Sequence, residues 1–173
     1  MSALEGASPY IRAESNLAAL GLDQMAASLP DYMRMVSEGD LEFCAALAEM
    51  TAAEVAAKEA RVTRQRIRSA GFPYEKTLAD FDWSFQPSVP RARGEELATL
   101  RFMERAENVL LVGSPGVGKT HLAIAVGIEA VRARREVRFM DCARLVDDLR
   151  DAQSRGILKK RLQYYAHSKL LII

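Results

Sequence analysis

Residues 108–126 read NVLLVGSPGVGKTHLAIAV and join an apolar run, a glycine-rich turn and a second apolar segment. The turn at residues 113–120, GSPGVGKT, matches the pattern G-x-x-x-x-G-K-[ST] at every fixed position. This pattern forms a phosphate-binding loop when a buried strand precedes it and a helix follows it. We therefore predict a buried strand at residues 108–112 and a helix at residues 119–134.

Each residue type in this loop suits the binding of a nucleoside triphosphate. Gly113, Gly116 and Gly118 permit backbone conformations and close approaches that a Cβ atom would block. Several N–H groups can then point at a β-phosphate, at the positive end of the following helix. Lys119 adds a cation for the β- and γ-phosphates, and the Thr120 hydroxyl is a ligand for Mg²⁺. We predict a site for ATP and Mg²⁺, with Thr120 as the metal ligand, formed by Gly113, Ser114, Pro115, Gly116, Val117, Gly118, Lys119, Thr120 and His121.

Hydrolysis of ATP needs an acidic residue at the end of another strand, where it holds Mg²⁺ through water. Residues 169–173 form an apolar strand of the kind that leads into such an acid, and the sequence ends there. Asp141 follows another predicted strand and is an alternative candidate for this acid. Its position before a helical segment favours a helix N-cap instead. The catalytic acid is therefore not assigned.

The segments around the loop alternate between helices and strands. Helices are predicted at 95–106, 142–153 and 158–167, and further strands at 136–140 and 169–173. Such alternation indicates βαβ crossovers and a parallel sheet. The predicted fold class is therefore α/β, with a P-loop NTPase domain at residues 95–173.

The first 71 residues are predicted to form a small all-α domain. Gly21 and Pro30 interrupt its helical periodicity, and Asp40 is a candidate N-cap. Residues 51–54 fit a capping box, so either a new helix begins there or one long helix passes through. Gly71 is placed to end the last helix near residues 69–70.

Residues 72–94 are predicted to form a linker that is rich in aromatic residues and proline. Its aromatic side chains are expected to pack on the core of the following domain; the alternative is that some of them wall an adenine pocket. The aromatic residues are Phe72, Tyr74, Phe81, Trp83 and Phe85, and the prolines of the segment are Pro73, Pro87 and Pro90.

The composition, 49% hydrophobic and 27% charged over 173 residues, is that of a globular protein. Residues 1–60 hold three basic and ten acidic residues, a net charge of −7, whereas residues 108–173 hold twelve basic and six acidic residues, a net charge of +6. Two groups of basic residues are candidates for DNA contacts, with solvation as the alternative. They are Arg61, Arg64, Arg66 and Arg68 in the first group, and Arg155, Lys159, Lys160 and Arg161 in the second.

Neither a membrane location nor a disulfide framework is expected. No apolar run approaches the ~20 residues that span a bilayer, and residues 1–16 do not resemble a signal peptide. We therefore expect a cytoplasmic protein. Cys44 and Cys142 are 98 residues apart without a CxxC pair, and we expect two buried, reduced thiols.

Residues 108–130, NVLLVGSPGVGKTHLAIAVGIEA, resemble the IstB-like ATP-binding proteins, the helper ATPases of a class of bacterial insertion sequences. They are also similar, more distantly, to DnaC-type helicase loaders. Residues 72–82, FPYEKTLADFD, resemble the linker of the family, and residues 145–149 with 170–173 resemble the stretch that leads to its Walker B motif. The helical start at residues 17–30 is similar to the family's N-terminal domain.

The resemblance implies a AAA+ ATPase behind a helical N-terminal domain. Members of the family assemble on double-stranded DNA as ATP-dependent homo-oligomers, without sequence preference, and act with a transposase. The sequence departs from the family in length, because it stops where the Walker B acids are expected. We therefore expect an incomplete sheet, low stability and no hydrolysis by this chain alone, since unpaired buried backbone groups cost roughly 1–3 kcal/mol each.

Three other functions remain open at this point. A helicase loader would use the N-terminal helices to hold a replicative helicase. A small-molecule kinase with a P-loop is disfavoured, because such kinases usually begin with the P-loop strand and 107 residues precede it here. A nucleotide-binding adaptor that does not hydrolyse ATP would fit the absent Walker B acid.

Overall fold

The computed structural model describes residues 7–84 and 90–173. Residues 1–6 of the predicted N-terminal segment, and Phe85 and Pro87 of the predicted linker, lie outside the described residues. The contacts divide the chain into two units, Met1–Val62 and Thr63–Ile173. The boundary falls inside helix α3 (Phe43–Ser69), so that each end of this helix belongs to a different unit.

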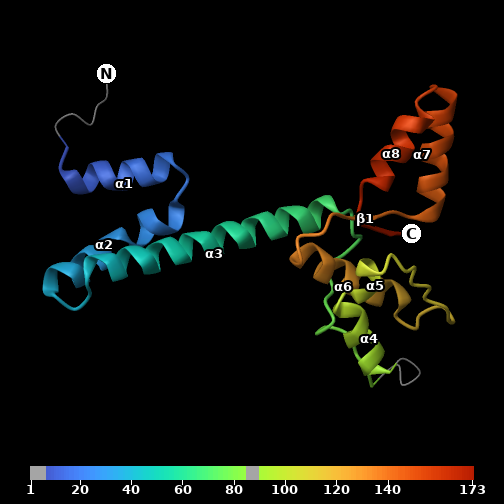
Figure 1. The fold of residues 1–173 in the computed structure, drawn as a ribbon, viewed down its shortest axis with the longest axis horizontal. Helices are drawn as coiled ribbons and strands as arrows, with labels where there is room; N and C mark the ends of the chain where they lie inside the picture. The colour runs from blue at the N-terminus through green and yellow to red at the C-terminus, as the bar shows by residue number, and fades with distance from the viewer. Residues whose placement is uncertain (1–6, 85–89) are drawn as a thin grey trace. The chain divides into compact units, whose positions relative to one another are not determined.

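The first unit consists of α1 (Pro9–Ala19), α2 (Asp23–Glu38) and the N-terminal part of α3 (Figure 1). Ser8 caps α1 by accepting a hydrogen bond from the N–H of Ile11 at 3.3 Å. Gly21 separates α1 from α2, as its left-handed φ of 70° allows, whereas Pro30 stays inside α2. Gly39 ends α2 in the same left-handed conformation.

Glu54 of α3 holds α2 in place. Its carboxylate accepts hydrogen bonds from the backbone N–H groups of Gln24, at 2.7 Å, and Met25, at 3.1 Å. The N-cap residue of α2, Leu22, has no side chain that can accept a hydrogen bond. The carboxylate of Glu54, which belongs to α3, therefore caps α2. Only 4% of Glu54 is exposed. A carboxylate buried to this extent is stable because the N–H groups that it meets need an acceptor.

The two capping predictions for this unit have different outcomes. The prediction that Asp40 is the N-cap of the next helix is wrong, because α3 begins at Phe43 and the N–H of Ala46 bonds to the carbonyl of Glu42. The N–H of Asp40 instead completes the end of α2 by donating to the carbonyl of Met35. At the possible capping box, α3 passes through as one helix, and the hydroxyl of Thr51 donates to a carbonyl of the preceding turn.

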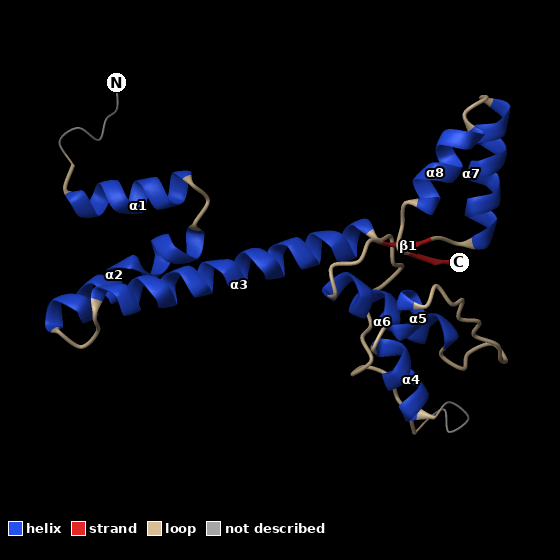
Figure 2. Ribbon diagram, viewed as in Figure 1, coloured by secondary structure: helices blue, strands red, loops and turns tan. Residues whose placement is uncertain are grey.

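The second unit contains the remaining helices and two short strands (Figure 2). Its elements are α4 (Arg91–Ala98), α5 (Arg101–Glu104), α6 (Lys119–Arg132), β1 (Val137–Phe139), α7 (Cys142–Ser154), α8 (Leu158–Ala166) and β2 (Leu170–Ile172). The strands pair in parallel, with Val137 opposite Leu170 and Phe139 opposite Ile172. The α7–α8 hairpin connects them and therefore forms a βαβ-type crossover. The described residues are thus mostly helical, with a small parallel sheet that is consistent with part of a P-loop NTPase.

Helix α6 forms the core of this unit. Eight of its residues are buried: Leu122, Ile124, Ala125, Val126, Gly127, Ile128, Ala130 and Val131. A Cβ atom at Gly127 would lie 2.8 Å from both Ile172 and Phe72, so glycine lets β2 and the linker approach the helix closely. Most of the helix surface is apolar, apart from the first turn and the ion pair of Glu129 with Arg132, and this suits a central position.

Three of the linker aromatics pack on the apolar clusters of this unit, as predicted, whereas Tyr74 is 43% exposed. Phe72 contacts the cluster around Ile128, and Phe81 is buried with Leu122 and Val126. The ring of Trp83 lies against Gly94, where a Cβ atom would meet it at 2.2 Å. Packing therefore accounts for these three rings.

The end of α3 is attached to the sheet. Helix α3 ends at Ser69, and Gly71 follows with a left-handed φ of 81°, as the sequence predicts. The N–H of Phe139 in β1 donates to the carbonyl of Ala70 at 2.7 Å. The backbone after α3 thus provides a hydrogen-bond acceptor on the open side of β1.

The predicted strand at residues 108–112 is wrong. Residues 107–114 have no regular secondary structure, and Leu110 and Val112 are 85% and 83% exposed. A strand requires a neighbour for its backbone N–H and C=O groups. In the described part of the chain, β1 and β2 pair with each other and neither pairs with residues 108–112.

The predicted helix at residues 95–106 is also only partly correct. Two helices occupy this region, and the first begins at Arg91, inside the predicted linker. Leu100 interrupts them with a φ of 60° and packs against both apolar clusters of the unit. Tertiary packing therefore stabilises a conformation that leucine rarely adopts.

The expectation of two buried thiols is wrong, since Cys44 and Cys142 are both exposed. Cys44 is the second residue of α3. Cys142 is the first residue of α7 and borders an open hollow of the second unit. No helix of the described residues is long and apolar enough to cross a membrane.

We predict that Glu54→Ala lowers the free energy of unfolding of the first unit by about 1–3 kcal/mol, because two backbone N–H groups lose their acceptor. Urea unfolding followed by circular dichroism measures the change. Glu14→Ala is the matched control, since this exposed carboxylate caps no helix in the described chain. Equal stability of the two variants would show that Glu54 does not act as a cap.

Candidate functional site

The glycine-rich loop leads directly into α6. Gly118 is the N-cap residue of this helix, with a φ of 87° and no capping side chain. The first hydrogen bond of the helix runs from the N–H of Leu122 to the carbonyl of Gly118. The N–H groups of Lys119, Thr120 and His121 therefore have no acceptor within the helix. Their positive end attracts an anion.

The glycines of the loop meet different surroundings. A Cβ atom at Gly118 would lie 2.8 Å from the ring of Phe81, so both conformation and space require glycine there. Gly116 has a φ of 83°, but a Cβ atom added to it would meet no described atom within 4 Å, so only its conformation requires glycine. Phe81 thus forms the wall behind the loop.

The side chain of Lys119 folds back onto the loop. Its ammonium donates to the carbonyl oxygens of Gly113, at 2.8 Å, and Ser114, at 2.7 Å. A cation is thereby held next to the free N–H groups at the start of α6. Thr120, the next residue after Lys119, is exposed and carries a hydroxyl. N–H donors, an ammonium and a hydroxyl form a donor set that fits a phosphate chain with a magnesium ion.

The structure places His121 differently from the rest of the predicted site. Its Nε2 atom lies 3.0 Å from the carbonyl oxygen of Thr77, and its ring meets Phe81 edge-on at 5.0 Å. The imidazole therefore faces the linker, and the backbone N–H is the part of His121 that belongs to the anion-attracting turn. Sequence reasoning missed this contact, which joins residues 44 positions apart.

Asp80 fixes the linker turn that His121 contacts. Its carboxylate accepts hydrogen bonds from the backbone N–H and the hydroxyl of Thr77, both at 2.8 Å. These bonds, the backbone one first, lower the pKa of Asp80. The spacing of Thr77 and Asp80 is a sequence signal for such a turn.

A hollow of about 580 Å³ lies beside the loop in the second unit. Lys119 and Thr120 border it, together with the C-terminal ends of β1 and β2 and with residues 107–111. In open α/β sheets, ligands bind beyond the C-terminal ends of the strands. The loop therefore occupies the position in which such a fold binds ligands.

Asp141 also borders this hollow, but its carboxylate is engaged. It accepts hydrogen bonds from the N–H groups of Ala143, at 2.9 Å, and Arg144, at 3.4 Å. The prediction that Asp141 is the N-cap of α7 is confirmed. Within residues 7–84 and 90–173, no three His, Cys, Asp or Glu side chains form a group that could hold a metal ion.

Of the basic residues predicted to face DNA on the α7–α8 hairpin, two are paired. Arg155 contacts Asp151 at 3.2 Å, and Arg161 donates to Asp148 at 2.6 Å. The bonds from Arg161 lower the pKa of Asp148. Burial, followed by the hydrogen bond that it donates to Asp148, raises the pKa of Tyr165 to about 12. This cluster ties α8 to α7.

Lys159 and Lys160 of α8 are exposed, and in the described chain neither forms an ion pair. A second basic area surrounds a hollow of about 370 Å³ at the ends of α3 and α6. Arg66, Arg135 and Arg138 border it. In the first predicted group, Arg61 pairs with Asp23 at 3.4 Å, whereas Arg64, Arg66 and Arg68 are exposed. Exposed cations without carboxylate partners are available to phosphates.

Comparison with known proteins gives consistent matches. The model of a family described as IstB-like ATP binding protein matches residues 15–173. A protein named as an ATP-binding protein of insertion sequence IS232, from Bacillus thuringiensis subsp. berliner, is 35% identical over 164 residues, 95% of this chain and 66% of the relative.

Two further relatives carry similar names. The one of insertion sequence IS21, from Pseudomonas aeruginosa, is 36% identical over 91% of this chain and 59% of its own length. The one of insertion sequence IS5376, from Geobacillus stearothermophilus, is 38% identical over 89% of this chain and 61% of its own length. The chain thus spans about three fifths to two thirds of the length of these three relatives. With the family model covering nearly the whole sequence, and with the phosphate-loop geometry described above, the chain belongs to the IstB-like ATP-binding protein family.

Proposed function

We propose that this chain binds ATP with Mg²⁺ through residues 113–120. The observation that carries the proposal is the start of α6, where free backbone N–H groups, the Lys119 ammonium and the Thr120 hydroxyl lie together beside the hollow. The family name and the names of the relatives support ATP as the nucleotide. An apolar loop without these donors would not compensate the charge of a triphosphate.

In this proposal, the residues of the loop make different contacts with the triphosphate. The backbone N–H groups of Gly116, Gly118, Lys119 and Thr120, with that of His121, bind phosphate oxygens. The ammonium of Lys119 neutralises phosphate charge, and the hydroxyl of Thr120 is a ligand of Mg²⁺. Ser114, Pro115 and Val117 shape the loop. Bound Mg²⁺ supplies charge compensation for the phosphates.

We infer that the cellular role of this binding is in DNA transposition. The three relatives described above are named for insertion sequences, and the full-length protein is proposed to be a AAA+ ATPase. In this proposal ATP promotes assembly of a cytoplasmic homo-oligomer on double-stranded DNA, which then acts with a transposase. The excess of basic residues in 108–173 supports a DNA-facing surface there.

Exposed and unpaired cations are the best candidates for this surface. Lys159 and Lys160 satisfy both conditions, whereas Arg155 and Arg161 are held by carboxylates of α7. Arg66 and Arg135, which border the hollow at the ends of α3 and α6, are also exposed, and no ion pair is found for either in the described chain. Contacts of this kind are to the phosphate backbone and carry no sequence information.

We predict that Lys119→Ala weakens binding of Mg·ATP by about ten- to a hundredfold, because a charge-assisted contact contributes roughly 1.5–3 kcal/mol. Isothermal titration calorimetry on the whole chain measures the affinity. Lys159→Ala, which removes an exposed ammonium far from the loop in sequence, is the control and is expected to bind ATP normally. Unchanged affinity in Lys119→Ala contradicts the proposal.

Gly118→Ala is predicted to weaken ATP binding more than Gly116→Ala. Both variants force alanine into a left-handed conformation, which costs about 1–2 kcal/mol, but only at Gly118 does the new Cβ atom collide with Phe81. Phe81→Leu should therefore restore part of the loss in the Gly118→Ala background. A thermodynamic cycle of the four proteins, measured by calorimetry, tests this. A coupling of zero between positions 81 and 118 would refute the steric account.

The double variant Lys159→Ala/Lys160→Ala should bind a double-stranded DNA fragment more weakly, with the dependence of log K on log salt reduced by about two. Fluorescence anisotropy at several salt concentrations gives both quantities. Arg155→Ala is the matched control, because its guanidinium is already paired with Asp151. If the control changes the slope as much as the double variant, α8 is not the DNA-facing element.

A further inference from the structure

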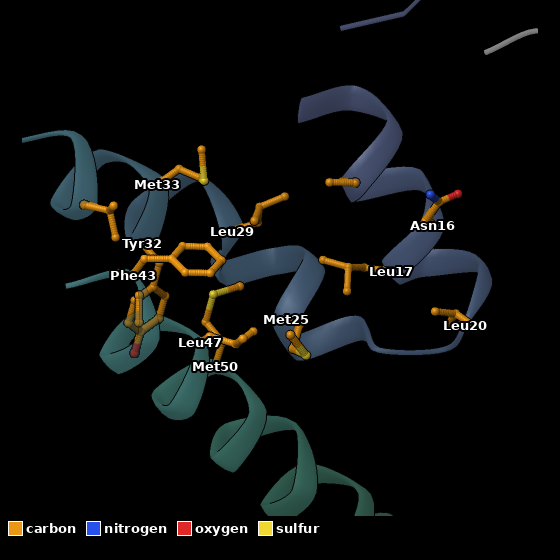
Figure 3. A pocket seen from close by; sticks show the side chains of 13 residues that line it. Asn16, Leu17, Leu20, Met25, Leu29, Tyr32, Met33, Phe43, Leu47 and Met50 are labelled. Atoms are coloured by element: carbon orange, nitrogen blue, oxygen red, sulfur yellow. The ribbon is translucent and has the colours of Figure 1, made fainter. Parts of the chain in front are cut away.

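The first unit contains an apolar groove that the proposed ATP site does not use (Figure 3). Three helices form it, with a volume of about 300 Å³. The lining includes Leu20, Met25, Tyr32, Met33, Phe43 and Met50. Only Asn16 and Tyr32 of this lining carry a polar side-chain group.

Large apolar side chains around this groove are exposed. Leu20 is 74% exposed, Phe43 61% and Met33 49%, whereas Met25 and Met50 form a buried floor. Figure 3 shows Leu20 at the end of α1 and Phe43 at the start of α3, with Met33 of α2 at the edge. A continuous apolar surface that spans three helices is characteristic of an interaction site.

The lining disfavours a small polar ligand. The hydroxyl of Tyr32 already donates to Glu49 at 3.0 Å, which raises the pKa of the tyrosine. A polar ligand would thus find almost no group to orient it, although such sites normally contain a few. Apolar side chains presented along one face of a helix need no such groups. Methionines adapt well to them, as in other helix-binding grooves.

The net charge of the segment that forms the groove indicates which charge a partner helix would carry. Residues 1–60 have a net charge of −7. In the sequence, Arg12 and Glu14 both adjoin Ala13 of the lining, and Glu42 adjoins Phe43. In the described part of this unit, neither Glu14 nor Glu42 forms an ion pair, whereas Arg34 and Arg61 are occupied by Asp31, Glu38 and Asp23. A segment with this net negative charge favours a partner that has cations flanking its apolar face.

We propose that this groove binds a basic amphipathic helix of a partner protein. The apolar residues of that helix, at positions i, i+3, i+4 and i+7, enter between Leu20, Met33 and Phe43. Its lysine or arginine residues face Glu14 and Glu42. This interaction is separate from the nucleotide site, since every residue of the groove belongs to the first unit.

Two labelled 18-residue designed peptides test the proposal on the whole chain. Both carry leucine at helical spacing, and their other positions are lysine in one peptide and glutamate in the other. Fluorescence anisotropy is expected to show at least tenfold tighter binding of the lysine peptide. Equal binding of the two peptides, or no binding of the lysine peptide, would overturn the proposal.

Variants of the chain locate the binding. Leu20→Glu and Met33→Glu should each weaken the lysine peptide at least tenfold, while Val55→Glu, an exposed position of α3 outside the groove, should not. Each variant adds a negative charge, so simple attraction to an acidic surface predicts tighter binding instead. Circular dichroism establishes that the helices are retained.

Analytical ultracentrifugation of the chain without peptide tests whether a second copy of the chain, rather than a partner helix, occupies the groove. The proposal predicts the same oligomeric state for the original chain and for Leu20→Glu. A dimer of the original chain that Leu20→Glu dissociates would assign the groove to a second copy and would overturn the proposal. Calorimetry with Mg·ATP on the same variants is expected to give unchanged affinity, so that failure of this proposal is distinguishable from failure of the ATP site.

Discussion

The packing of Phe81 against the first turn of α6 is the contact on which the candidate site depends. Its ring is 7% exposed and lies with Leu122 and Val126 in one apolar cluster, 4.5 Å from the centre of Trp83. The ring fills the space next to the Cα atom of Gly118 and leaves no room for a side chain there. Gly118 is the N-cap of α6 in a left-handed conformation, and the free N–H groups follow it at the start of the helix. A linker segment thus stabilises the geometry that attracts phosphate.

The same helix connects the site to the sheet. The interior of α6 packs on β1, β2 and the end of α3, while its first turn carries the proposed phosphate contacts. His121 lies at this junction, with its N–H on the phosphate side and its ring on the linker. The two basic areas and the apolar groove lie elsewhere and serve other partners in our proposals.

Local patterns predicted the parts of the structure that local interactions determine. The start of α6, the left-handed Gly71 and the N-cap Asp141 each follow from residues within a few positions. The predicted strand at 108–112 failed because pairing needs a distant neighbour. Likewise, the carboxylate of Glu54 reaches N–H groups about 30 positions away, and the break at Leu100 reflects packing against two clusters. The periodicity of apolar residues does not reveal contacts between residues so far apart in the sequence.

The central claim is that backbone N–H groups at the start of α6 bind the triphosphate. Nuclear magnetic resonance of the ¹⁵N-labelled chain, titrated with Mg·ATP, tests it most directly because it observes each N–H group. The account predicts that the largest changes in amide signals occur at Gly116, Gly118, Lys119 and Thr120, while those of Gly21 and Gly39 in the first unit stay in place. Largest changes in the first unit, or none in the loop at saturating nucleotide, would contradict it.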